Sequence, residues 1–123
     1  MDSIGKTTWL IPDMYWPEIT TEGHYVSHEA ICILNVNKQD CNVDITLYYE
    51  DRDPVRGFSA VCKAERTNHI RMDLLLDSDG KHIPKGVPYA AVVKASIPVV
   101  VQYSRLDTTQ SANALMTTMA FPI

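Results

Sequence analysis

Residues 97–114 read IPVVVQYSRLDTTQSANA and constrain the fold more than any other stretch of this chain. A strand with one wet face alternates apolar and polar residues, whereas Val99, Val100 and Val101 are consecutive. We therefore predict that a second sheet covers one face of this strand and that a loop or a subunit covers the other. Buried charges need partners, so Arg105 and Asp107 mark either a structural ion-pair network or a ligand site. The polar set that ends the run is Gln102, Ser104, Arg105, Asp107, Gln110 and Asn113.

Clusters of turn residues recur along the chain, roughly every eight to fifteen residues. This spacing predicts an all-β protein: a single-domain antiparallel β-sandwich over residues 1–123, jelly-roll-like, with little or no helix. Residues 113–121 are compatible with a short helix or a strand, and we predict a strand because every other element is one. The other predicted strands are residues 4–11, 25–36, 43–50, 58–64, 67–74, 89–95 and 98–106. The clearest alternation is in residues 43–50, where Val43, Ile45, Leu47 and Tyr49 share one face and Asp44, Thr46 and Tyr48 share the other.

Composition narrows the classes of partner. The formal net charge is -4, which argues against nucleic acid or an anionic membrane, although a tetramer that pools basic patches keeps DNA binding open. Cys32, Cys41 and Cys62 show no C-x-x-C spacing, and we expect buried, reduced thiols in a cytoplasmic protein rather than a zinc site. The first residues do not form a signal peptide, and no apolar run approaches the ~20 residues of a membrane helix.

The pair His28–Glu29 is the best candidate for a metal site of the kind that cupin barrels hold. Adjacent residues on a strand point to opposite faces, so these two side chains cannot reach one ion unless a bulge separates them. We therefore predict no metal and no cofactor. We expect His28 to be hydrogen-bonded at the start of a strand and Glu29 to pair with an arginine.

A basic cluster occupies residues 66–71, RTNHIR. On a strand His69 and Arg71 share one face, while Ile70 lies on the opposite, apolar face. Such a stripe, together with Arg66, suits a carboxylate or phosphate through charge-assisted hydrogen bonds. The solvated outer face of a sandwich is the other interpretation, and it is the more common outcome.

Catalysis is the weaker hypothesis for this chain. None of its serines has the context of a nucleophile elbow. A general acid–base enzyme would draw on Glu29, His69 and Asp107, and a metal-assisted enzyme acting on a sugar phosphate would draw on His28, Glu29 and His69.

Five stretches of the chain resemble the sensory rhodopsin transducer family. In order, and over almost the whole chain, they are SIGKTTWLIP, SHEAICILN, VDITLYYEDRDP, RTNHIRMDLL and IPVVVQYSRLDTTQSANALM. The resemblance implies a small, non-enzymatic β-sandwich that assembles as a homotetramer. Family members that accompany a microbial rhodopsin carry its light signal into the cytoplasm. Others occur without one, and the likeness of the sandwich to carbohydrate-binding proteins implies a sugar-derived metabolite as ligand.

The family's polar positions fall here on His28, Glu29, Arg66, His69, Arg71, Gln102, Arg105 and Asp107. Our leading hypothesis is a signalling or ligand-binding module whose ligand, anionic or rich in hydroxyl groups, lies near Arg66, His69, Arg71 and Arg105. Trp9, Tyr15 or Trp16 would stack on a sugar face. A structural adaptor for a membrane receptor is the alternative. The irregular loop between Trp9 and Ser27 departs from the family, and the absence of a polar tail after Ile123 weakens the expectation of a rhodopsin partner.

Overall fold

The computed structural model describes residues 3–20, 23 and 25–123. Every regular element in this part of the chain is a strand, which confirms the predicted all-β sandwich. The strands are β1 (Lys6–Met14), β2 (His28–Asn35), β3 (Cys41–Tyr49), β4 (Val55–Cys62), β5 (Arg66–Arg71), β6 (Tyr89–Asp107), β7 (Ala114–Met119) and β8 (Phe121–Pro122). The predicted strand over residues 113–121 is thus present as β7 and the start of β8, interrupted at Ala120, and no helix forms there.

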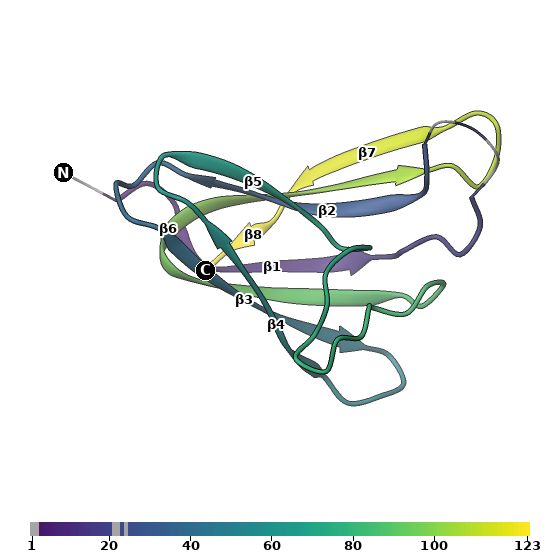
Figure 1. Ribbon diagram of the computed structural model, residues 1–123, viewed down its shortest axis with the longest axis horizontal. Coiled ribbons are helices and arrows are strands. Elements are labelled where there is room, and N and C mark those ends of the chain that lie inside the picture. The colour runs from purple at the N-terminus through teal and green to yellow at the C-terminus, as the bar shows by residue number, and fades with distance from the viewer. Residues whose placement is uncertain (1–2, 21–22, 24) are drawn as a thin grey trace.

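Two antiparallel sheets form the layers of the sandwich (Figure 1). Sheet A has the order β4-β3-β6-β1-β8, and sheet B has the order β5-β2-β6-β7. Strand β6 belongs to both sheets, because its first half pairs with β3 and its second half pairs with β2. One long strand therefore links the two layers.

The prediction that β6 would be two strands, separated at residues 96–98, was wrong. The last pair that β6 makes with β3 is at Ala95, and its first pair with β2 is at Val100. Pro98 lies between these two ladders, where its missing N–H removes no sheet hydrogen bond. The proline therefore marks a corner inside a continuous strand. For a similar reason β1 runs past Pro12 to Met14, since its pairing with β6 is irregular between Ile11 and Met14.

The inner faces of the two sheets enclose one apolar core. In β3 the alternating residues Val43, Ile45 and Leu47 are fully buried, as their pattern predicted. In β6 Val99 and Val101 point into the core, whereas Val100 lies on the outer face of sheet B and is half-buried. The prediction that both faces of residues 99–101 are covered thus holds for the inner face, whereas the outer face is only partly covered.

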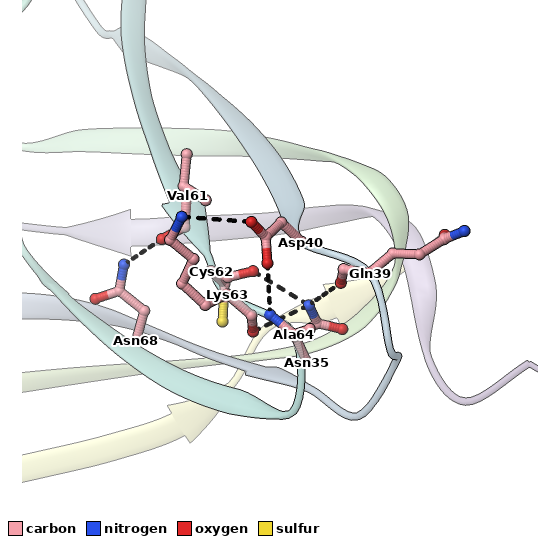
Figure 2. Close-up of polar contacts among 8 residues, drawn as sticks. All are labelled: Asn35, Gln39, Asp40, Val61, Cys62, Lys63, Ala64 and Asn68. Atoms are coloured by element: carbon pink, nitrogen blue, oxygen red, sulfur yellow. Dashed lines mark hydrogen bonds and ion pairs between the residues drawn. The ribbon is translucent and has the colours of Figure 1, made fainter.

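The buried side chain of Asn35, at the end of β2, connects this strand to the segment before β3 and to the end of β4 (Figure 2). The amide nitrogen of Asn35 donates to the backbone carbonyl oxygens of Gln39, Cys62 and Lys63 at 2.8, 3.1 and 3.2 Å. Its amide oxygen accepts from the backbone and the side chain of Asn37. Asn37 in turn donates to the carbonyl oxygen of Pro98 at 2.8 Å, so this network also holds the corner of β6.

The three cysteines are free thiols. Cys41 and Cys62 are buried and lie opposite each other on β3 and β4, as expected for apolar strand positions. Cys32 is only half-buried, on the outer face of sheet B, so the prediction that it is buried was wrong.

Candidate functional site

The eight polar positions singled out from the sequence do not form one cluster, because they lie on opposite faces of sheet B. His69 on β5 and Gln102 on β6 point to the outer face, where with Cys32 and Met119 they line a hollow of ≈ 170 Å³. Glu29 and Arg105 lie on the inner face, in register with each other on β2 and β6. No single small ligand contacts both sets.

The basic stripe on the outer face carries less free charge than its sequence predicted. The Arg71 guanidinium donates two hydrogen bonds to the Asp73 carboxylate, at 2.8 and 2.7 Å. Arg66 is exposed and donates to the carbonyl oxygen of Glu65. The solvated outer face is thus the better description of Arg71, and Arg66 is exposed at the start of β5. Of the cluster, Thr67 and His69 line the hollow, and His69 is its only basic residue to do so.

His28 and Glu29 point to opposite faces, as strand geometry predicted. His28 begins β2 and hydrogen-bonds through Nδ1 to the carbonyl oxygen of Val26 at 2.8 Å. Glu29 is 1% exposed and lies among core residues. No group of three metal-ligating side chains occurs in residues 3–20, 23 and 25–123. The same described ranges contain no helix long and apolar enough to cross a membrane.

The partners of Glu29 differ from those expected. We predicted an arginine, but the carboxylate accepts hydrogen bonds from the Tyr89 hydroxyl at 2.6 Å, from the Tyr103 hydroxyl and from the backbone N–H of Tyr15 at 2.7 Å. An arginine acts only through an intermediary, because Arg105 donates from Nε to the Tyr103 oxygen at 3.1 Å. The result is a buried carboxylate whose charge is stabilised by three donors.

Arg105 and Asp107 do not pair with each other. Nη2 of Arg105 lies 3.7 Å from the exposed carboxylate of Asp13, and its guanidinium carbon lies 5.9 Å from the ring centre of Tyr15. Asp107 accepts from the backbone N–H of Thr109, and hydrogen bonds with Thr109 lower the pKa of the Asp107 carboxyl. Nη2 of Arg105 is buried and has no hydrogen-bond partner among the described residues, so the structural network accounts for only part of the bonding capacity of Arg105.

The two tyrosine hydroxyls of this network have shifted pKa values. Burial, followed by the negative charge of Glu29, raises the pKa of both Tyr89 and Tyr103 well above the usual value near 10.0. Both phenols therefore stay neutral and keep donating to the carboxylate over the whole physiological range. The sequence did not single out Tyr89 or Tyr103, and only the inner-face position of Tyr103, two residues before Arg105, connects either of them to the site.

These raised pKa values predict a loss of stability in alkali. In the unfolded chain Tyr103 loses its proton near pH 10, whereas in the folded protein it keeps it, so the free energy of unfolding falls as the pH rises above about 10. Each such group contributes a slope of about 1.4 kcal/mol per pH unit. Urea unfolding between about pH 9 and pH 11 should therefore show a shallower decline for Tyr103→Phe than for the wild type. Equal slopes would contradict this assignment.

A cleft opens beside the network. Its volume is ≈ 400 Å³, and Tyr89 lines it together with Asp13, Tyr48, Tyr49, Glu50 and Pro88. Tyr89 thus donates its hydroxyl hydrogen bond to the buried carboxylate and also borders the cleft. The aromatic residues expected to stack on a ligand lie elsewhere. Trp9 is 5% exposed and donates to two backbone carbonyl oxygens, so its proposed stacking role was wrong. The Trp16 ring contacts Lys85.

Two sheets that share one strand define the class of this protein as an all-β sandwich. Within that class the chain belongs to the Anabaena sensory rhodopsin transducer family, whose model matches residues 4–122. The resemblance found in the sequence is thereby confirmed.

Two solved structures are similar over nearly the full length. One, titled "Crystal Structure of Thermotoga maritima 1070", has 34% identity and a TM-score of 0.83, covering 97% of this chain and 96% of the other. The Anabaena sensory rhodopsin transducer has 39% identity and a TM-score of 0.75, covering 89% of this chain and 96% of its own. No curated protein sequence matches the chain.

Proposed function

We propose that this protein is a non-enzymatic, cytoplasmic signalling module that assembles as a homotetramer and relays a signal by protein contact. Membership of the transducer family supports the signalling role. The observation that carries the mode of action is the edge of sheet B, where all six residues of β7 are exposed.

Strand β7 is an unusual edge. It contains no charged residue and no proline, the features by which edge strands ordinarily avoid pairing with another chain. Leu115 and Met119 are 72% and 57% exposed, and on the same outer face Leu34 is 46% exposed beside Val100. We call these four residues and β7 the β7 face. An apolar, uncharged surface of this kind fits a second copy of the chain, and closed symmetric assembly would cover the outer side of the valine run.

The partner proposed for the assembled module is a membrane receptor of the rhodopsin class, because the transducer to which this chain is similar is named for one. A sugar-derived or anionic ligand held by Arg66, His69, Arg71 and Arg105 stays a prediction. The geometry gives it limited support, since Arg71 is engaged by Asp73 and Arg105 lies on the opposite face.

Charge placed on the β7 face should break the assembly. We expect the wild type to have the mass of four chains in multi-angle light scattering, and Leu115→Lys/Met119→Lys to give a smaller species, because burying two ammonium groups in an apolar contact is unfavourable. Val61→Lys is the control, since Val61 is an exposed apolar residue, 44% exposed, on β4 of the other sheet. A monomeric wild type, or a double variant that keeps the wild-type mass, would refute the proposal.

A further inference from the structure

The cleft beside Tyr89 has a chemistry of its own. Three tyrosines, Tyr48, Tyr49 and Tyr89, line a space of ≈ 400 Å³ together with Asp13 and Glu50. Among the described residues that line it, none is basic, and the nearest cation to the Asp13 carboxylate is Arg105, whose Nη2 lies 3.7 Å away. A volume of this size accommodates a small organic molecule.

The walls favour a cation over an anion or a neutral ligand. Aromatic faces attract positive charge through the ring quadrupole, and nearby carboxylates add to the attraction. The rings of Tyr49 and Tyr89 are close, with centres 6.1 Å apart and planes tilted by 35°. An adjoining hollow of ≈ 210 Å³ is lined by Glu50 and Asp51, which extends the acidic rim.

The protein itself already places a cation on this aromatic surface. The guanidinium carbon of Arg52 lies 5.0 Å from the ring centre of Tyr49. Arg52 is largely exposed and bonds Asp51, its neighbour in the chain, so its hold on the ring is a surface contact. The same attraction to an aromatic ring is available to a free small cation in the cleft.

The second wall is rigid. Tyr89 is 5% exposed, and its hydroxyl is fixed by the buried Glu29 carboxylate at 2.6 Å. This bond fixes the Tyr89 side chain before any ligand arrives, so binding does not have to immobilise it. The buried network thus holds one residue of the cleft lining in place.

From these observations we infer that the cleft formed by Asp13, Tyr48, Tyr49, Glu50 and Tyr89 binds a small organic ammonium ion. The site is separate from the β7 face and does not depend on the proposed assembly.

Choline is the probe that tests this site, and 3,3-dimethyl-1-butanol, which has nearly the same shape without the charge, is its control. Titrations by calorimetry or by amide NMR shifts should be run at constant ionic strength, set with sodium chloride, because salt screens exposed charges. We expect saturable binding of choline, with shifts at residues of the cleft, and no saturable binding of the neutral alcohol or of glucose.

Two variants test the contribution of the aromatic ring and that of the carboxylate separately. Tyr49→Leu should weaken choline binding about 2- to 30-fold, the range that cation–aromatic contacts span. Glu50→Gln, at an exposed position, should also weaken it. Asp44→Asn removes the same charge from an exposed position of β3 outside the cleft and should leave binding unchanged.

The inference is overturned if choline does not bind the wild type, if the neutral alcohol or glucose binds as well as choline, or if both Tyr49→Leu and Glu50→Gln bind like the wild type. Light scattering of the same samples reports the proposed assembly independently, so failure of one proposal is distinguishable from failure of the other.

Discussion

Replacing Glu29 with alanine is expected to lower the free energy of unfolding by about 3–5 kcal/mol, the range found when one partner of a buried charged network is removed. The substitution leaves two buried phenol hydroxyls, of Tyr89 and Tyr103, and the N–H of Tyr15 without their acceptor. It also leaves a cavity where the side chain lay, since Glu29 is 1% exposed. Urea unfolding at a fixed protein concentration measures the effect.

Two further variants make this prediction specific. Glu29→Gln keeps the shape and one acceptor oxygen, so it should cost less than alanine and yet remain destabilising, because its amide N–H₂ replaces an acceptor that faces donors. Asp44→Ala removes an exposed carboxylate from β3 and should change stability by less than about 0.5 kcal/mol. If Glu29→Ala is no worse than Asp44→Ala, the buried carboxylate does not stabilise the fold.

The second large effect is expected at Asn35. Replacing it with alanine removes the donor to three backbone carbonyl oxygens and the acceptor for Asn37, as Figure 2 shows for the donor side. Asn35 is 0% exposed, so water does not replace these partners, and we expect a loss of about 3 kcal/mol or more. Asn35→Asp should be at least as destabilising at neutral pH, because a carboxylate would then face carbonyl oxygens.

Asn68 provides the matched control in the same region (Figure 2). It is half-buried and donates one hydrogen bond, to the carbonyl oxygen of Val61 at 2.9 Å. Asn68→Ala should therefore cost only about 1 kcal/mol. Thermal or urea unfolding of the three variants ranks them, and an Asn35→Ala protein as stable as Asn68→Ala would show that the corner of the sandwich does not depend on this network.

The arrangement of strands could be predicted because local patterns determine it. The alternation in β3 identified Val43, Ile45 and Leu47 as core residues, and strand geometry placed His28 and Glu29 on opposite faces. The continuous β6 could not be predicted, because proline ordinarily ends a strand. Pro98 is tolerated only because two different partner strands meet beside it, and that depends on tertiary structure.

The candidate site was less accessible to sequence reasoning. Tyr89 and Tyr103 bond Glu29 across 60 and 74 residues, and no local pattern reports which of several strand tyrosines a buried carboxylate will meet. The pairing of Arg71 with Asp73 is different, since two opposite charges so close in the chain are visible in the sequence. Asp73 lies in the turn that follows β5. The cleft combines β1, β3 and β6 and requires the folded structure.

Hydrogen–deuterium exchange of the β7 amides tests the central claim most directly, because it reports whether another chain covers this edge. We predict that exchange in residues 114–119 slows as the protein concentration rises, while amides in β4, an edge of sheet A, exchange at the same rate throughout. Exchange in β7 that stays fast at every concentration would contradict the proposal that the module works through assembly on this face.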